Sequence, residues 1–383
     1  MKKNICLFPA LLALLAVACT KEKAIHVSVE NPSSYDRTGE IVEIAFEALN
    51  GLPEGSFVIL NAEGKQIPYQ LTYDKKVVFP VTVPANGTTG VVFTRGTPEV
   101  YDTLVCGKHY PERKDDIAWE NDRIAFRLYG PALQASGEQA FGYDVWVKNV
   151  AEPVVEDRYH QELVHGITYH TDHGNGLDYY SVGPTLGAGA SALMANDTLV
   201  YPYCYRTYEI LDNGPLRFTV KLTYNPLHTG DGEDVIETRL LSLDAGSQLN
   251  KVTLSFDGLS RTTPLATGIV IHDPSHDYLA DTAEGFIAYA DPLDPANGQL
   301  YVGCVFPSTV KETKAVYFSD REKTKRKAEG HVLALSDYVP GTNFTYYWGG
   351  GWSKWGFPTS ADWFAYVKAF SQKISTPPAV KVR

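Results

Sequence analysis

Histidine, tyrosine and aspartate side chains are concentrated in one glycine-rich stretch, residues 159–191 (YHQELVHGITYHTDHGNGLDYYSVGPTLGAGAS). Four of the ten histidines of the chain lie in it: His160, His165, His170 and His173. Imidazole accepts and donates protons near neutral pH, which suits it to acid–base chemistry. Glycine permits backbone conformations that other residues resist, so we expect a surface loop here that carries a binding or catalytic site.

Within this loop, His170 and His173 are the candidate general bases. Tyr179 and Tyr180 follow Asp178, and in an extended chain the two tyrosines point to opposite faces, so only one can enter a shared cleft. We select Tyr179 as the candidate general acid and Asp178 as a substrate-binding residue. The alternatives are that the tyrosines pack a sheet edge and that the histidines only hydrogen-bond a neighbouring loop.

Three arginines are candidates for binding an anionic substrate group. Arg206 lies in the stretch RTYEI, whose alternation places Arg206 and Tyr208 on one face of a strand. A guanidinium at that position can bind a carboxylate with two parallel hydrogen bonds. Arg113 and Arg127 compete for the same role. Any one arginine is more often a surface charge, so the three stay alternatives.

Further candidate binding residues stand next to the expected strands. Glu120 and Asn121 come just before a strand, in an acidic set that a solvated turn also explains. His272 follows an apolar strand, where a structural turn is the alternative. Trp348 and Trp352 lie in the glycine-rich run WGGGW and are candidates for a platform under a sugar ring. A buried aromatic corner is the competing explanation.

A metal site is the less favoured interpretation of the loop, and we expect no cofactor. His170, His173 and Asp178 offer two imidazoles and a carboxylate. However, an HxxH pair in a glycine-rich loop lacks the helical geometry that places both nitrogens on one face. Calcium binding through Asp172 and Asp178 has no recognisable loop signature.

The N-terminus has the pattern of an export signal. Lys2 and Lys3 precede a short apolar run and then small residues before Cys19. This run is too short for a membrane span and predicts a secretory signal peptide over residues 1–18. The small residues resemble a bacterial lipobox, although Ala16 stands where leucine is usual. We therefore expect a lipoprotein that is lipidated at Cys19 and anchored to the outer membrane, on either face.

The chain is acidic and poor in cysteine. Its net charge is −11, and removal of the two lysines in the leader makes it −13. This charge argues against nucleic acid as a partner, and a polyanionic substrate requires a locally basic site. Cys106, Cys204 and Cys304 are too few for a disulfide framework, so one disulfide and three buried thiols remain the alternatives. The 24 tyrosines suit sugar-binding surfaces as well as sheet faces.

Short runs of alternating apolar and polar residues, separated by turn residues, extend over most of the chain. Their period is that of β-strands, so we expect an all-β protein. Residues 25–100 are expected to form a small N-terminal β-sandwich. Residues 104–380 hold ten or more further strands, which predicts a large antiparallel domain of two stacked sheets that carries the site.

One helix is expected, close to the C-terminus. Trp363, Val367, Phe370 and Ile374 recur at helical spacing, and Ser360 is placed to cap the first turn. A single terminal helix that packs on a sheet leaves the class all-β.

Several stretches of the chain resemble known proteins. One resemblance is to the large supersandwich of galactose mutarotases and several polysaccharide lyases. It rests on the order in which Trp119–Asp122, the alternating strands after it and Arg206–Tyr224 follow one another. Four longer stretches are Glu112–Gln134, Tyr143–Asn149, His173–Ala190 and Tyr346–Trp352. Together they resemble a lipoprotein family with a domain of unknown function that is encoded in bacterial polysaccharide-utilisation loci. Some members of that family resemble oligosaccharide dehydratases.

The resemblance implies a carbon–oxygen lyase that removes water from a terminal uronic acid of an oligosaccharide and leaves a 4,5-unsaturated sugar. Such an elimination needs a cation for the carboxylate, a base for the proton beside it and an acid for the departing hydroxyl. We assign His170 or His173 as base, Tyr179 as acid and Arg206 as the cation. The alternatives are a lipid-anchored glycan-binding protein, a mutarotase and a glycosidase, and the number of subunits stays open.

Overall fold

Strands are the main regular secondary structure of this computed structural model, so the all-β prediction is confirmed. The alternating pattern has the expected effect in β18 (Asp234–Asp244), where every second side chain is buried. The predicted leader and Cys19 lie outside the described part of the chain. The described residues are 24–229, 234–275, 277–308 and 310–383.

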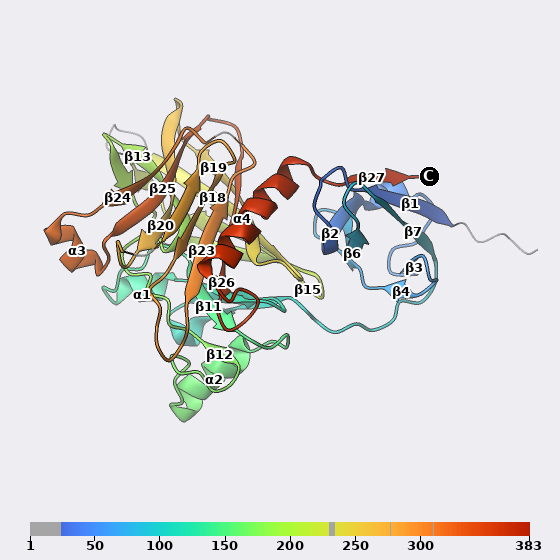
Figure 1. Ribbon diagram of the computed structural model, residues 1–383, viewed down its shortest axis with the longest axis horizontal. Helices are drawn as coiled ribbons and strands as arrows, with labels where there is room; N and C mark the ends of the chain where they lie inside the picture. Colours follow the sequence, from blue (N-terminus) through green and yellow to red (C-terminus); the bar gives the residue numbers. More distant parts are fainter. Residues whose placement is uncertain (1–23, 230–233, 276, 309) are drawn as a thin grey trace, which may run out of the picture.

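The N-terminal strands form a small sandwich of two sheets (Figure 1). It has a core of its own, in which Phe57, Phe79 and Phe93 are fully buried. The 3-10 helix η1 (Phe46–Leu49) connects two of its strands. One sheet has the order β27 (Ala379–Val382), β1 (Ile25–Glu30), β7 (Thr88–Arg95), β3 (Phe57–Leu60) and β4 (Gln66–Ile67). The other has the order β2 (Arg37–Ala45), β6 (Lys76–Val83) and β5 (Gln70–Leu71).

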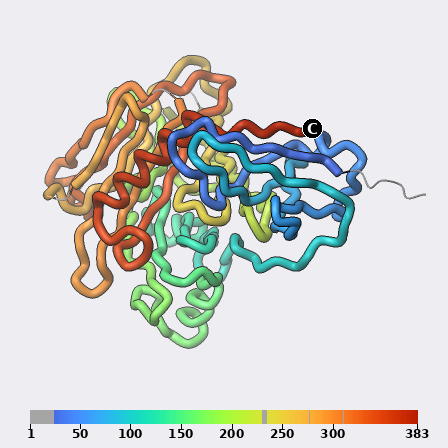
Figure 2. Tube along the Cα trace, turned by 45° about the vertical axis from the view of Figure 1, so that its right-hand side comes forward, coloured from blue at the N-terminus to red at the C-terminus, as the bar shows by residue number. Residues whose placement is uncertain are grey.

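The last strand of the chain, β27, belongs to this N-terminal sandwich. It pairs antiparallel with β1, and Val382 lies opposite Val27. Figure 2 shows the C-terminal segment running alongside the first strand. The sequence analysis did not predict this strand, because four residues after two prolines are too short to show an alternating pattern.

Two larger antiparallel sheets pack face to face and share one hydrophobic core. The shorter sheet has the order β14 (Thr198–Val200), β13 (Ala188–Ala195), β20 (Thr263–Ile271), β25 (Gly330–Tyr338) and β24 (Glu312–Tyr317). The longer one has the order β15 (Tyr205–Gly214), β16 (Arg217–Tyr224), β18, β19 (Leu249–Asp257), β26 (Phe344–Trp352), β23 (Leu300–Val305), β22 (Phe286–Ala290) and β21 (Tyr278–Asp281). A short strand, β17 (Leu227–His228), pairs with β18.

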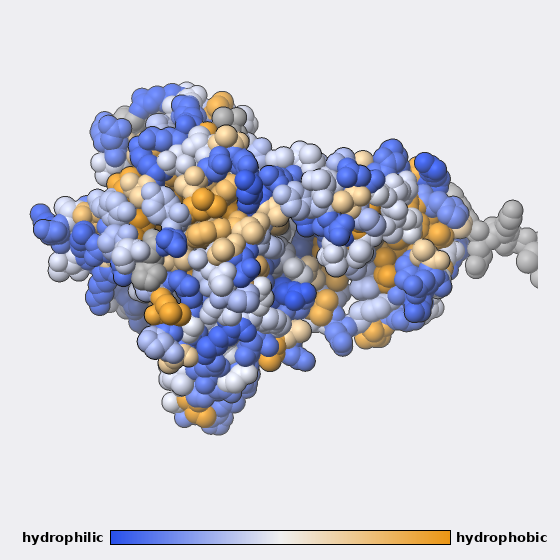
Figure 3. All heavy atoms as spheres, viewed as in Figure 1, coloured by the Kyte–Doolittle hydropathy of each residue, from blue (hydrophilic) through white to orange (hydrophobic). Residues whose placement is uncertain are grey.

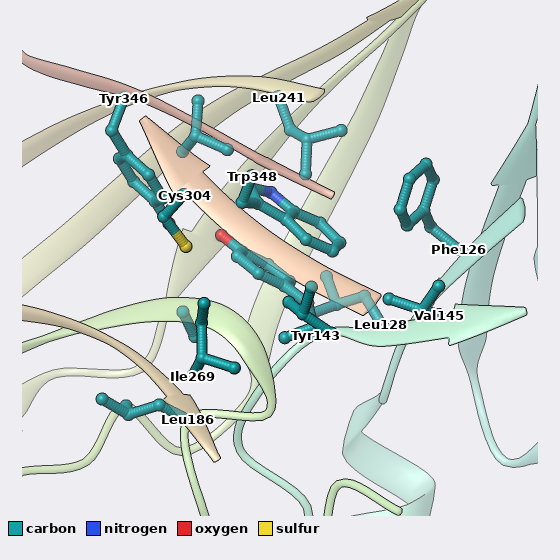
Figure 4. Close-up of a cluster of buried hydrophobic side chains, with 14 of the residues drawn as sticks. Phe126, Leu128, Tyr143, Val145, Leu186, Leu241, Ile269, Cys304, Tyr346 and Trp348 are labelled. Atoms are coloured by element: carbon teal, nitrogen blue, oxygen red, sulfur yellow. The ribbon is translucent and has the colours of Figure 1, made fainter. Parts of the chain in front are cut away.

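Trp348 lies at the centre of this core (Figure 4). Its ring stacks on Tyr143 with 4.1 Å between the ring centroids, and Phe126 meets it edge-on at 4.9 Å. Gly189 has φ +129°, and a Cβ there would lie 2.8 Å from the Trp348 Cβ, so only glycine fits. Strands β13 and β26 can therefore approach each other closely at this point.

A third antiparallel sheet covers one side of the larger sandwich. Its order is β12 (Gly176–Leu177), β11 (Asp144–Lys148), β10 (Ala125–Leu128), β9 (Asp116–Glu120) and β8 (Cys106–Tyr110). One face of the sheet contributes Ile117, Trp119 and Val145 to the large core. The other face packs against the helix α2 (Val155–His165) through Trp146 and Tyr159.

The predicted C-terminal helix is confirmed as α4 (Ser360–Ser375), and Trp363 and Val367 are its buried residues. Its N-cap is Thr359 and not Ser360, since Thr359 and Asp362 form a reciprocal capping box. Three other helices were not predicted: α1 (Pro131–Ala135), α2 and α3 (Asp320–Arg326), besides the 3-10 helix η2 (Pro111–Arg113). The loop prediction over 159–191 is therefore wrong at both of its ends, because residues 159–165 belong to α2 and residues 188–191 are the buried start of β13.

The three described cysteines Cys106, Cys204 and Cys304 are free thiols, which decides between the two alternatives for them. Cys304 is fully buried beside Gly189 in the core. Within the described ranges, no helix is both long and apolar enough to cross a membrane.

The capping box gives a direct test of where α4 begins. Thr359→Ala should lower the free energy of unfolding by about 1 kcal/mol, because it removes the acceptor for the Asp362 backbone N–H. Ser360→Ala should leave it within about 0.5 kcal/mol, since Ser360 does not supply the cap. Urea unfolding followed by circular dichroism measures both. Equal losses in the two variants would contradict the assignment.

Candidate functional site

Charged residues occupy the face of the third sheet that turns toward α2. Alternation directs Asp116 of β9, Arg127 of β10 and Asp144 of β11 to this face, while the residues between them enter the large core. Arg127 and Asp144 are direct cross-strand partners. All three side chains are buried. A charge removed from water needs opposite charge and hydrogen bonds, so this face has to form a polar network.

Arg127 is the centre of that network. Its Nε donates to Asp144 Oδ2 at 2.8 Å, and its Nη2 donates to Asp178 Oδ2 at 2.7 Å. The guanidinium carbon also lies 4.9 Å from the ring centres of both Trp146 and Tyr129. Charge-assisted hydrogen bonds and cation–π contacts together compensate for the lost hydration.

Three carboxyl groups, those of Asp116, Asp144 and Asp178, surround this one guanidinium. Burial raises the pKa of Asp178 to about 8, although Arg127 acts in the opposite direction. Burial likewise raises the pKa of Asp116 to about 6. Tyr159 donates to one oxygen of Asp116 at 3.2 Å, and the other oxygen has no partner among the described residues. The network therefore holds a proton that ordinary aspartates would have lost at neutral pH.

The outer edge of the network consists of Tyr169, His170 and Arg113. The Tyr169 hydroxyl accepts hydrogen bonds from Arg113 Nε at 3.0 Å and from Arg127 Nη1 at 3.3 Å. His170 Nδ1 lies 2.9 Å from the Asp178 carbonyl oxygen and 3.6 Å from Asp178 Oδ2. The His170 side chain is 55% exposed, so the edge reaches solvent there. Clusters with perturbed pKa values at an accessible surface are candidate functional sites.

The loop that presents His170 is held by its own hydrogen bonds. Asp172 Oδ1 accepts from the backbone N–H groups of Gly174 and Gly176 at 2.9 and 3.0 Å. Gly176 has φ +94°, and a Cβ there would lie 2.2 Å from the Val147 carbonyl oxygen. His173 is exposed, and its Nε2 lies 2.9 Å from the Thr168 carbonyl oxygen. His170 and His173 therefore differ in position: only His170 contacts the Arg127 network.

A second polar cluster lies just beyond Asp178 along the chain. His272 Nδ1 lies 2.6 Å from Asp291 Oδ1, and its Nε2 lies 2.7 Å from the Ser181 carbonyl oxygen. Burial alone would lower the pKa of His272, but Asp291 outweighs it and the net shift is upward. Tyr179 is half-buried, with its hydroxyl 3.5 Å from the Gly298 carbonyl oxygen. His272 and Tyr179 thus anchor the segment that carries Asp178 to neighbouring loops.

The structure does not bring Arg206 and Tyr208 into the network. A β-bulge at Arg206 interrupts the pairing of β15 with β16, so the alternation that predicted a shared face does not hold there. Arg206 is exposed, and no described residue forms a hydrogen bond or ion pair with it. The Tyr208 ring instead packs on His109, with 4.6 Å between centroids.

The prediction that Trp348 and Trp352 form a platform for a sugar ring is also wrong. Trp348 is fully buried in the core, so no sugar ring can reach its faces. Trp352 is 2% exposed and donates from Nε1 to the Asn297 carbonyl oxygen at 2.7 Å. The alternative of a buried aromatic corner describes both residues.

Glu120 and Asn121 have structural roles in place of the predicted substrate contacts. Glu120 accepts from Lys148 Nζ at 2.7 Å and from the Val155 backbone N–H at 2.8 Å, which holds the start of α2. Asn121 donates from Nδ2 to the Asp244 carbonyl oxygen at 2.7 Å. Both side chains are buried and fully engaged, so neither faces a ligand.

The structure brings together four of the predicted site residues, Arg113, Arg127, His170 and Asp178, and adds Tyr169 and Asp144, which were not predicted. A signal for Asp144 was present, since charged residues at alternating positions of otherwise buried strands demand partners. No three described histidine, cysteine, aspartate or glutamate side chains form a group that could hold a metal ion.

A model of the family described as a domain of unknown function, DUF4861, matches residues 29–380. The chain belongs to the DUF4861 family. "Uncharacterized protein P7" of Formosa agariphila is 27% identical to it over 406 residues, which cover the whole of both chains. The match of this DUF4861 chain to the family model includes both the N-terminal sandwich and the Arg127 network.

Two solved structures from Enterococcus faecalis have a similar fold. One is described as a protein in glycosyl hydrolase family 38, with a TM-score of 0.53, 8% identity, and coverage of 94% of this DUF4861 chain and 47% of that chain. The other is described as an alpha-mannosidase, with a TM-score of 0.52, 8% identity, and coverage of 94% and 46%. The DUF4861 chain thus spans about half the length of both proteins. At this identity the likeness concerns the fold alone.

The raised pKa of Asp178 predicts a pH-dependent stability. The folded protein keeps the Asp178 proton up to about pH 8, whereas an unfolded chain loses it near the ordinary value of 3.8. The free energy of unfolding of the wild type should therefore fall as pH rises from 5 to about 8. Asp178→Asn removes this titration, so its stability should fall less steeply over the same range. Urea unfolding at several pH values measures the difference.

Asp172→Asn is the matched control for this prediction. Backbone hydrogen bonds from Gly174 and Gly176 outweigh burial and lower the pKa of Asp172, so it is ionised in both states throughout that pH range. Its profile should run parallel to that of the wild type. A parallel profile for Asp178→Asn as well would contradict the proton that we place on Asp178.

Proposed function

We propose that this protein is a carbohydrate-active enzyme that eliminates water from a terminal uronic acid of an oligosaccharide, leaving a 4,5-unsaturated sugar. The observation that carries the proposal is the placement of Arg113, Tyr169 and His170 side by side at the edge of the Arg127 network, where His170 is exposed, Arg113 is half-buried and Tyr169 is buried beneath them. The names of the two structural relatives, a glycosyl hydrolase family 38 protein and an alpha-mannosidase, support a carbohydrate substrate.

Arg113 is the group proposed to bind the substrate carboxylate. Its Nε is engaged by Tyr169, while no described residue accepts a hydrogen bond from its two Nη atoms. A guanidinium with two such donors matches the geometry of a carboxylate. Neutralising that carboxylate acidifies the adjacent C–H bond, which is the requirement of a β-elimination. Arg113 supplies the positive charge for an acidic substrate, since the charge of Arg127 is balanced by the buried acids around it.

His170 is the proposed base. The Asp178 carbonyl oxygen can only accept a hydrogen bond, so Nδ1 carries the proton in the contact of 2.9 Å. The neutral ring then has its lone pair on Nε2, where it can take the proton from the substrate carbon. The Asp178 carbonyl oxygen, at 2.9 Å from Nδ1, continues to accept this hydrogen bond when the imidazolium forms and so stabilises the charged ring.

Tyr169 replaces Tyr179 as the proposed acid, because Tyr179 faces Gly298 and does not contact the network. Burial raises the pKa of Tyr169 against the lowering effect of both arginines, so its hydroxyl is protonated at neutral pH. When that proton passes to the departing hydroxyl, the Arg113 and Arg127 donors stabilise the phenolate left behind.

Export and lipidation at Cys19 are part of the same proposal. An anchor at the outer membrane would keep the enzyme where oligosaccharides are processed before uptake. The soluble form that begins after Cys19 keeps every residue of the Arg127 network and is the form to assay.

The decisive experiment is incubation of this soluble form with a panel of oligosaccharides that end in a uronic acid. A conjugated unsaturated uronate absorbs ultraviolet light, and mass spectrometry reports the loss of one water without chain cleavage. Absorbance that appears together with cleavage would make the protein a polysaccharide lyase. Binding without turnover across the panel would favour the glycan-binding alternative.

His170→Ala should lower kcat by about 10²–10⁴-fold, the usual contribution of a positioned general base. His173→Ala is the matched control, since His173 lies in the same loop without contact to the network, and its kcat should stay within about twofold of the wild type. Steady-state turnover of the best substrate in the panel measures both. Full turnover in His170→Ala would remove this histidine from the mechanism.

Arg113→Lys should weaken the use of uronate substrates, because an ammonium cannot form two parallel hydrogen bonds to a carboxylate. We expect kcat/KM to fall roughly 10–100-fold, which corresponds to about 1.5–3 kcal/mol for a lost charge-assisted bond. Arg206→Lys should change it less than twofold, roughly, as expected for an exposed surface charge. A larger loss in Arg206→Lys than in Arg113→Lys would restore Arg206 as the clamp.

A further inference from the structure

A groove lies between the N-terminal sandwich and the larger body. None of the residues that line it belongs to the Arg127 network. It has a volume of about 460 Å³ and is lined by residues of β2, β16, β18, β19, β26 and α4. Figure 3 shows the recessed waist between the two bodies. Ligand sites of proteins commonly have volumes of roughly 300–1,000 Å³ and prefer domain interfaces. The groove therefore has the size and the place of a second binding site.

The floor of the groove is the outer face of the longer sheet. Lys251 of β19 stands between Tyr347 of β26 and Ser242 of β18, which are its direct cross-strand partners. The residues next to Lys251 along the strand, Asn250 and Val252, are buried in the core. Alternation therefore turns Lys251 and Tyr347 outward into the groove.

One wall of the groove is α4, which presents Tyr366, Phe370 and Lys373 at helical spacing on one face. The rings of Tyr347 and Phe370 lie 5.2 Å apart, and those of Tyr366 and Phe370 lie 6.1 Å apart. All three rings are half-buried, so parts of them remain accessible. Aromatic rings with a polar end are suited to the faces of sugar rings.

The acidic side chains that line the groove all form ion pairs, whereas two of its lysines form none within the described part of the chain. Glu43 is paired with Lys76 at 2.9 Å and with Arg217 at 3.0 Å, and Asp244 is paired with Arg217 at 2.6 Å. The remaining acid, Glu40, is paired with buried Arg37. Lys251 and Lys373 also line the groove, and neither has an acidic partner among the described residues.

The lining therefore has an excess of positive charge in a chain whose net charge is −11. Four cations, Arg37, Arg217, Lys251 and Lys373, face three acids. Burial lowers the pKa of Lys373, and the opposite effects of Glu40 and Asp36 do not fully offset it. A bound anion would place a counter-charge beside both lysines.

We propose that this groove is a second, non-catalytic binding site for acidic oligosaccharides. The carboxylates of the ligand would pair with Lys251 and Lys373, and its sugar rings would lie against Tyr347 and Phe370. The site would hold the protein on an acidic glycan while a chain end enters the Arg113 site. The proposal does not depend on the identity of the reaction at that other site.

The test is isothermal titration of the soluble form with a saturated hexagalacturonate probe, with a neutral glucose hexamer as the reference sugar. Lys251→Ala/Lys373→Ala should weaken binding of the acidic hexamer at least tenfold. The control variant Arg321→Ala/Lys325→Ala also removes two positive charges, but from the exposed helix α3, and should leave the affinity unchanged. Melting temperatures within a few degrees of the wild type show that each variant is folded.

Arg113→Ala separates the two sites. This variant should abolish turnover but keep most of the affinity of the groove for hexagalacturonate. A failure of the proposed reaction can therefore be told apart from a failure of binding in the groove. Unchanged affinity in the lysine pair variant would overturn the proposal, as would loss of all hexagalacturonate binding in Arg113→Ala. Equal affinity for the neutral hexamer would overturn the choice of an acidic ligand.

Discussion

The burial of the Arg127 charge is the constraint on which the candidate site depends. A guanidinium placed between a sheet and a helix is stable only if acids and ring faces surround it, and Asp144, Asp178 and Trp146 do so. Asp178 comes from a different segment than the sheet, so its hydrogen bond with Arg127 holds the loop after α2 against the sheet. The position of His170 follows from it, because His170 bonds the backbone of Asp178.

The large core acts on the site from the opposite face of the same sheet. Residues of β9, β10 and β11 that alternate with Asp116, Arg127 and Asp144 pack around Trp348. The packing density of such a core fixes the strands to within small displacements. Packing on the apolar face of the sheet thereby also fixes the positions of the charged side chains on its polar face. Charges that are already in place need little reorganisation during a reaction.

Much of the fold could be predicted from the sequence, because alternating burial has a simple period. It indicated the all-β class, the two-sheet body and the C-terminal helix with Trp363 and Val367. The short helix α2 escaped prediction, since its buried stripe consists of only three residues and one of them is Arg158. The strand β27 was missed because its four residues are too few to show alternation, and its partner β1 lies at the other end of the chain.

The site was predictable only in part, for a different physical reason. Residue types indicated His170, Asp178, Arg113 and Arg127, since imidazole suits acid–base chemistry and guanidinium suits carboxylate binding. Which tyrosine and which arginine join them depends on tertiary packing, since Tyr169 lies in a turn and Arg113 in η2, while the bulge at Arg206 altered the alternation on which its prediction rested. Trp348 shows the converse, because an aromatic residue in a glycine-rich strand suits a core as well as a ligand.

The pairing of β27 with β1 has a mechanical consequence. The chain passes between the two bodies twice, once through the segment before β8 and once from α4 into β27. Two covalent connections remove rotations that a single linker would permit, so the default freedom between domains is reduced. A force applied at the N-terminal end of β1 is shared with β27 through their backbone hydrogen bonds, and from there it reaches α4. The N-terminal sandwich is thus tied to the larger body at two points of the chain.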